Sequence, residues 1–184
     1  MINWDEFEHI HVIKKLKQVL NSWWNIDVVF TDERGMLRGI DLQQANAFCN
    51  PAVQTFLSKD TALSSLAEAI QKSWEDIRTS GNRYAIKKWD TAGFDMAIVP
   101  IMIENDYMGS VVALGFLKDR QQVSRISEIR ERMAIFGASG DTIDKAISKV
   151  SFIDDQDREH FVQLVELVAQ EVVTLHLEIT PRLS

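Results

Sequence analysis

The chain has 184 residues, of which 46% are hydrophobic and 26% are charged, a balance typical of a globular domain. Its formal net charge of −7 argues against non-specific nucleic-acid binding, which needs a basic surface. One Cys excludes an intramolecular disulfide, and 8 Gly with 3 Pro exclude a collagen-like chain.

No segment of the sequence predicts a leader peptide or a membrane span. The N-terminus is acidic and lacks an apolar core followed by a small-residue cleavage site, which argues against a secretory signal. Long apolar runs such as Met96–Ile103 are far shorter than the ~20 residues of a spanning helix. We therefore expect a cytoplasmic location and no membrane contact.

The N-terminal quarter predicts a helix followed by a β-hairpin. Apolar residues at intervals of three and four predict one continuous helix over Asp5–Trp24. The β-branched run Ile26–Thr31 predicts a strand, and Met36–Ile40 predicts the returning strand. Gly35 lies in the turn between them, where a positive φ is easily adopted.

Two helices are predicted next. Pro51 is expected to start a short helix, because proline lacks the backbone N–H that the first turn of a helix leaves unused. Asp60 or Thr61 is expected to cap a longer helix, and Gly81 stands where a glycine ends a helix.

The centre of the chain predicts three antiparallel strands joined by short polar turns. The strands are expected at Arg83–Trp89, Phe94–Ile103 and Tyr107–Leu117. The second is apolar on both of its faces, which indicates a strand covered on both sides.

The remaining sequence predicts helices. One is expected over Gln121–Phe136, and Asp141 is expected to cap a short second helix. A long helix should start near Asp154 or Asp155 and end at about Ile179. The predicted fold is therefore α+β, with a central antiparallel sheet of about five strands flanked by N- and C-terminal helices.

This order of elements and two blocks of sequence resemble the GAF/PAS-type sensor domains of bacterial signalling proteins. Residues 26–37 are similar to their strand, Asp-x-x-Gly, strand hairpin, and residues 93–111 are similar to their apolar, Pro-Ile, turn, Gly, strand hairpin. The position of Cys49 between the blocks, with the Pro-Ile and Tyr-x-Gly placement, resembles the PocR-type sensory branch.

The resemblance implies a domain that detects a small molecule between its sheet and the covering helices. It also implies that the terminal helices pass the signal to a kinase, a cyclase or a DNA-binding domain. We accordingly interpret residues 1–184 as a single sensor-like domain, which could be the N-terminal part of a longer signalling protein.

Small residues along the third central strand indicate where a ligand could fit. Gly109, Val111, Ala113 and Gly115 are expected to project from one face. Either a helix packs closely there, or the face lines a cavity whose walls are larger apolar side chains, with Phe116 among them. The predicted ligand-binding residues are Cys49, Tyr84, Trp89, Phe94, Met96, Gly109, Ala113 and Gly115.

Motifs for catalysis and metal binding are not found in the sequence. His9 and His11 are two residues apart and would point in different directions on a helix, so we expect no metal site. No nucleophile or nucleotide-binding motif occurs, so we do not expect an enzyme, and no cofactor is predicted. Cys49 is either a buried small side chain or a pocket-lining thiol, with no clearly basic residue nearby in sequence to lower its pKa.

Three functions remain open, the weakest of which is an enzyme with an unrecognised site, which perturbed acids converging in a cleft would support. The first is a ligand-sensing homodimer that associates through its first and last helices and acts on a downstream domain or protein. The second is a degenerate GAF/PAS-like fold that serves as a protein-interaction or dimerisation module without a ligand. An open, partly polar cavity would favour the first, whereas an exposed apolar patch rimmed by charge would favour the second.

Overall fold

The computed structural model describes residues 2–7, 10–42, 44, 47–118 and 123–179. Its helices are α1 (Trp4–Phe7), α2 (His11–Trp24), α3 (Pro51–Leu57), α4 (Asp60–Ser80), α5 (Val123–Ile135), α6 (Gly140–Lys149) and α7 (Asp155–Ile179). Its strands are β1 (Asp27–Asp32), β2 (Leu37–Arg38), β3 (Ala85–Lys88), β4 (Asp95–Ile103), β5 (Asp106–Leu117) and β6 (Ser151–Phe152).

The strands form one sheet in the order β2-β1-β5-β4-β3, in which every neighbouring pair is antiparallel. The predicted α+β class with a five-stranded antiparallel sheet is therefore confirmed. The short strand β6 was not predicted; it pairs with the end of β5 in parallel. Two residues are too few to show the alternation by which a strand is recognised in a sequence.

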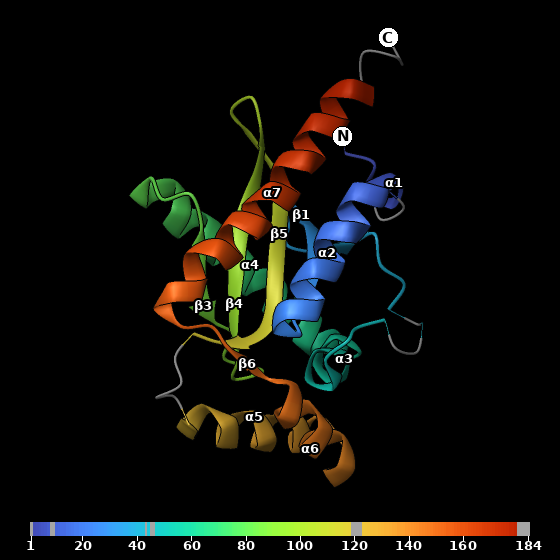
Figure 1. Ribbon diagram of the computed structural model, residues 1–184, viewed down its shortest axis with the longest axis vertical. Coiled ribbons are helices and arrows are strands. Elements are labelled where there is room, and N and C mark those ends of the chain that lie inside the picture. The colour runs from blue at the N-terminus through green and yellow to red at the C-terminus, as the bar shows by residue number, and fades with distance from the viewer. Residues whose placement is uncertain (1, 8–9, 43, 45–46, 119–122, 180–184) are drawn as a thin grey trace.

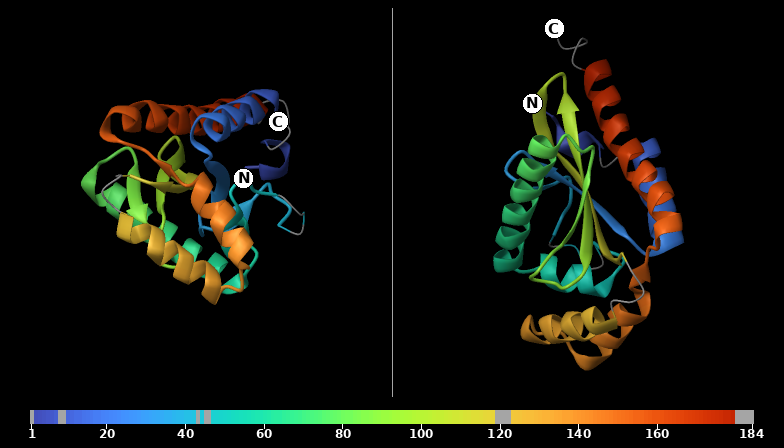
Figure 2. Two further views of the ribbon diagram at one scale, coloured as in Figure 1. Left: turned by 60° about the horizontal axis from the view of Figure 1, so that its bottom comes forward. Right: turned by 90° about the vertical axis from the view of Figure 1, so that its left-hand side faces the viewer.

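Helices cover both faces of the sheet, as the apolar pattern of β4 predicted. Helices α2 and α7 lie side by side across one face, while α3 and α4 cover the other (Figure 1). Helices α5 and α6 close the sheet at the end where β5 meets β6 (Figure 2). Each face has its own apolar core, so the central strands are buried between two hydrophobic layers.

The predicted continuous helix over Asp5–Trp24 is wrong, because the structure divides it into α1 and α2. Ile10 adopts an extended conformation (φ −75°, ψ 126°) immediately before α2. Phe7 and Ile13 are both buried, yet residues six apart on one continuous helix would point about 120° away from each other. The interruption lets both side chains reach the same core.

The starts of two other helices follow local capping chemistry. Pro51 begins α3 as predicted, and the Asn50 side chain accepts a hydrogen bond from the Ala52 backbone N–H at 2.8 Å. The predicted Asp141 cap of α6 is wrong, since the cap is Ser139, whose hydroxyl accepts from the Thr142 backbone N–H at 3.2 Å. A hydroxyl two residues upstream of Asp141 caps the helix equally well.

A buried ion pair attaches α5 to the sheet. The Asp95 carboxylate, 1% exposed, accepts from the Arg125 guanidinium at 2.7 Å and from the Lys118 backbone N–H at 2.9 Å. Arg125 also donates to the Gly93 carbonyl at 2.9 Å. These contacts tie α5 to the start of β4 and to the residue that follows β5.

We predict that Asp95→Ala destabilises the fold by about 3–5 kcal/mol, because the guanidinium of Arg125 stays largely buried after its carboxylate is removed. Asp144→Ala is the matched control. Its ion pair with Arg130 is exposed and should contribute less than about 1 kcal/mol. Urea denaturation measures the free energy of unfolding of both variants. Equal decreases in the two variants would contradict the structural role of the Asp95–Arg125 pair.

Candidate functional site

The eight residues predicted to bind a ligand do not line one cavity, because the sheet separates them. Trp89, Phe94 and Met96 belong to the core under α3 and α4. Ala113 belongs to the opposite core, under α2 and α7, and half-buried Tyr84 packs against that same core. Trp89, Phe94, Met96 and Ala113 are therefore packing residues of the two cores, whereas Tyr84 also lines a separate open hollow at the β3 edge of the sheet.

The core beneath α3 and α4 is filled by aromatic rings. Phe56 of α3 lies 5.9 Å from the ring centres of both Trp89 and Phe94. The indole N–H of Trp89 donates to the Ser65 hydroxyl at 3.1 Å, so its polar atom is satisfied within the protein. Edge-on packing of this kind stabilises a core and leaves little space for a ligand.

The small residues of β5 do not share one face, which corrects the predicted alternation. A β-bulge shifts the pairing of β4 and β5 so that Asp95 faces Phe116 and Met96 faces Leu114. Gly115 is the additional residue. It has a φ of +96°, and a Cβ there would lie 3.2 Å from Val53 of α3.

Gly109 and Ala113 are also explained by close packing. A side chain at Gly109 would collide with the Thr31 carbonyl of β1, so glycine allows these two strands to pair. Ala113 is fully buried in the core that the α7 residues Phe161 and Val165 share. Of the two alternatives, close packing therefore describes this part of β5, against strand β1 at Gly109 and against helix α7 at Ala113.

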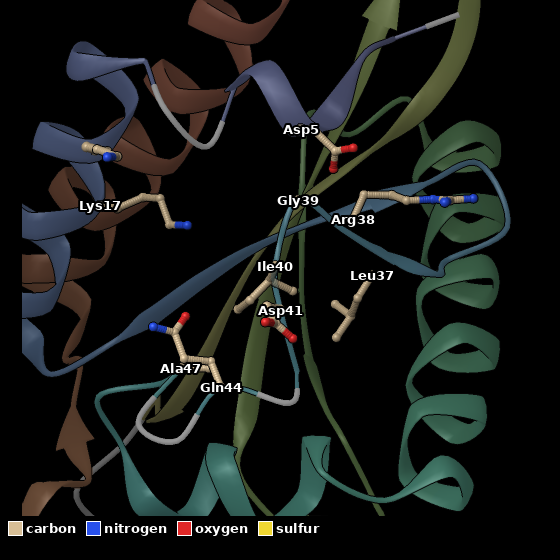
Figure 3. Close-up of a pocket in the computed structure, with 10 residues that line it drawn as sticks. Asp5, Lys17, Leu37, Arg38, Gly39, Ile40, Asp41, Gln44 and Ala47 are labelled. Atoms are coloured by element: carbon tan, nitrogen blue, oxygen red, sulfur yellow. The ribbon is translucent and has the colours of Figure 1, made fainter.

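An open groove of about 690 Å³ lies at the β2 edge of the sheet. We call it the α2 groove, because α2 forms one wall and the segment following β1 forms the other (Figure 3). Its size is within the range of small-molecule sites. Its lining residues are Asp5, Lys14, Lys17, Leu37, Arg38, Gly39, Ile40, Asp41, Gln44 and Ala47.

A second hollow of about 530 Å³ adjoins the α2 groove and contains Cys49. The two hollows share Lys17, Ile40 and Ala47, so they form adjoining parts of one depression beside α2. We call the second part the Cys49 hollow. Of the eight predicted ligand-binding residues, Cys49 is the one that lines this depression.

A buried carboxylate forms the base of the Cys49 hollow. Asp27, 8% exposed, accepts hydrogen bonds from the backbone N–H groups of Cys49 at 2.8 Å and Asn50 at 3.1 Å. Burial raises the pKa of Asp27, while these two N–H groups and the charge of Lys17 act in the opposite direction. The carboxylate thus holds the segment before α3 against β1.

The same arrangement disfavours the thiolate form of Cys49. Burial raises its pKa to about 12, and the neighbouring Asp27 carboxylate adds to the rise. The charge of Lys149 acts in the opposite direction, but its effect on the pKa is smaller than those of burial and of Asp27. Cys49 is nevertheless partly exposed in the depression, so its slow alkylation can report on access to this region.

Sequence reasoning missed the α2 groove. Lys14, Lys17 and Asp41 look like ordinary solvent-facing charges in the sequence, and no motif joins them. These three residues line one groove because β2 and the residues after it lie beside α2. This contact joins segments that are distant in the sequence, so no local pattern predicts it. The one available signal was the position of Cys49 after the first hairpin, which indicated this part of the chain.

Comparisons with known proteins do not identify the chain, since no family model, curated protein or solved structure matches it. Among the described residues, none of the helices has the length and apolar character needed to cross a membrane. Within the same part of the chain, His, Cys, Asp and Glu side chains form no cluster of three or more suited to hold a metal ion. The resemblance to sensor domains therefore stays a prediction.

We predict that iodoacetamide alkylates Cys49 in the folded chain at pH 8 roughly ten- to a hundredfold more slowly than in the urea-unfolded chain, because the smaller thiolate fraction is partly offset by the higher nucleophilicity of a thiolate of higher pKa. The reason is that the pKa of the thiol rises from 9.0 to about 12, which reduces the reactive thiolate. Mass spectrometry measures the rate at this single cysteine.

Asp27→Asn should accelerate the alkylation, because it removes a negative charge that disfavours the thiolate. Asp106→Asn, at an exposed position, is the control and should leave the rate unchanged. A folded-state rate equal to the unfolded-state rate would contradict the buried environment assigned to the thiol.

Proposed function

We propose that this chain is a cytoplasmic, GAF/PAS-like regulatory domain, closest to the PocR type, that binds a small molecule in the α2 groove. The observation that carries the proposal is an open, partly polar hollow whose wall is a helix that also packs on α7. Such a hollow favours ligand binding over a purely structural role. The site lies at the edge of the sheet and differs from the interior cavity that the resemblance implies.

The packing of α2 supplies a physical connection from the groove to α7. Lys14 and Lys17 project from α2 into the groove. The opposite end of the same helix contacts α7, where the rings of Trp24 and Phe161 meet edge-on at 5.8 Å. A ligand that touches both walls of the groove would favour one position of α2.

Signalling then follows from differential binding. If the ligand binds one arrangement of α2 and α7 more tightly than another, it shifts the population towards that arrangement. The size of the shift is limited by the ratio of the two affinities. A downstream domain or protein that contacts α7 would respond to this change.

We predict that at least one pool of small metabolites raises the melting temperature of the full chain and slows alkylation of Cys49. The pools would contain amino acids, dicarboxylates and sugar phosphates. A ligand in the groove should have both effects, because the groove adjoins the Cys49 hollow. The measurements are differential scanning fluorimetry and mass spectrometry of the alkylated chain.

The variant Lys17→Gln tests whether the groove is the site. It should abolish both effects, whereas Lys72→Gln on the outside of α4 should preserve them. If no pool acts on the chain, or if a pool acts equally on Lys17→Gln, the proposed ligand site is wrong.

A second candidate function is dimerisation without a ligand, and the outer side of α2 favours it. Val12, Leu16, Val19 and Trp23 recur at intervals of four, three and four, the spacing of a helix–helix seam. Trp23 is 68% exposed and Val12 is 45% exposed. Exposed aromatic and aliphatic side chains in such a row are typical of an interface with another helix.

We predict that the chain forms a homodimer and that Trp23→Ser raises the dimer dissociation constant at least about tenfold, because it removes the largest exposed apolar side chain of the row. Met36→Ser is the control, since Met36 is 48% exposed at the β1–β2 turn, away from α2. Analytical ultracentrifugation measures the dissociation constant of each variant. If the unmodified chain sediments as a monomer both at high concentration and after 100-fold dilution, the proposed interface is wrong.

A further inference from the structure

A further hollow lies between α3 and α6, two helices that lie against each other at one end of the sheet (Figure 1). Its volume is about 550 Å³, within the range of small-molecule sites. We call it the α3–α6 hollow. Its lining residues are Phe48, Cys49, Pro51, Gln54, Thr55, Ser58, Lys59, Phe136, Gly137, Ala138, Ser139, Thr142 and Lys149.

The charged residues that line the α3–α6 hollow are both cationic. Lys59 immediately precedes α4 and Lys149 ends α6, whereas none of the lining residues carries a carboxylate. Within the described part of the chain, neither ammonium group forms an ion pair. In a chain with a net charge of −7 this hollow is a locally cationic surface, so it attracts an anion and repels a cation.

Hydrogen bonds within the protein leave a third donor in the hollow. The side-chain carbonyl of Gln54 accepts from the Phe48 backbone N–H at 3.2 Å, so its NH₂ group remains as a donor. The hydroxyls of Thr55 and Ser58 instead donate to backbone carbonyls of α3 at 2.8 and 2.9 Å. An anion would therefore be recognised by ammonium and amide groups.

Aromatic side chains distinguish this hollow from the α2 groove. Phe48 and Phe136 belong to its lining, whereas none of the residues that line the α2 groove is aromatic. The half-buried ring of Phe136 is held by an edge-on contact with Phe56, with ring centres 5.2 Å apart. A ring that is already held in place loses little conformational freedom when a second ring packs against it.

We propose that the α3–α6 hollow binds a small organic anion that carries an aromatic ring. The ring of the ligand packs against Phe136, and its anionic group is attracted by Lys59 and Lys149. The α3–α6 hollow shares no lining residue with the α2 groove, so the inference assigns a second site and goes beyond the proposed function.

Four probes of equal carbon number test the ligand class by isothermal titration of the full chain. They are 3-phenylpropanoate, 3-cyclohexylpropanoate, 3-phenylpropan-1-ol and 3-phenylpropylamine. We expect 3-phenylpropanoate to bind at least about tenfold more tightly than the alcohol and the amine, because only the carboxylate gains charge-assisted contacts with the lysines. It should bind roughly threefold more tightly than the cyclohexyl analogue, because only a planar ring packs favourably against another aromatic ring.

Two results would overturn the assigned ligand class. Equal binding of 3-phenylpropanoate and 3-phenylpropan-1-ol would show that the lysines do not select an anion. Equal or tighter binding of 3-cyclohexylpropanoate would show that the ligand ring need not be aromatic. Phe136→Leu should remove the preference for the phenyl over the cyclohexyl probe, since it replaces the ring on which that preference depends.

The double substitution of Lys59→Gln with Lys149→Gln tests the location of the site. It should weaken binding of 3-phenylpropanoate at least about tenfold and leave the affinity for 3-phenylpropan-1-ol unchanged, because it removes the positive charge of the hollow. Lys72→Gln with Lys145→Gln is the matched control, since it removes the same charge at two exposed positions outside the hollow. Unchanged affinity for 3-phenylpropanoate in the first double variant would overturn the proposal.

The outcome for this second site can be separated from the outcome for the proposed function. Lys17→Gln should leave the binding of 3-phenylpropanoate unchanged, because Lys17 does not line the α3–α6 hollow. If Lys17→Gln abolishes this binding and the double substitution at Lys59 and Lys149 does not, the probe occupies the α2 groove and the second site is wrong. If none of the four probes binds, the second site is wrong, and the Lys17-dependent effect of the metabolite pools alone decides the proposed function.

Discussion

The buried carboxylate of Asp27 is the contact on which the arrangement around α2 depends. It receives the backbone N–H groups of Cys49 and Asn50, and so holds the chain at the point where α3 begins. Asn50 caps α3, and Val53 of that helix packs against the glycine of the β5 bulge. One acidic side chain thus positions a wall of the depression and the helix beneath it, at the cost of desolvating its own charge.

Close packing on both faces of the sheet decides where a ligand can be accommodated. The central strands are covered by α3 and α4 on one side and by α2 and α7 on the other, and the residues between these layers are largely inaccessible. Protein interiors at this density have few voids larger than a water molecule. The edge of the sheet, where β2 is only two residues long, is where the described hollows adjoin α2.

Helix α2 has two sides with different consequences for function. The side that faces the protein carries Ile13 and Leu20 into the core and Lys17 into the depression. The outer side carries Trp23 and Val12, which remain exposed. Ligand binding and self-association therefore involve the same helix, and a change in its position at one surface would be felt at the other.

The sequence by itself determined the α+β class, the five antiparallel strands and most helix boundaries, because these depend on periodicity, turn residues and capping within a few positions. Tertiary structure decided what depends on distant residues. The break before α2 arises from the burial of both Phe7 and Ile13, and the bulge at Gly115 moves a predicted site residue to the other face. The groove was not predictable, since Lys17 and Asp41 become neighbours of one hollow only when β2 folds back beside α2.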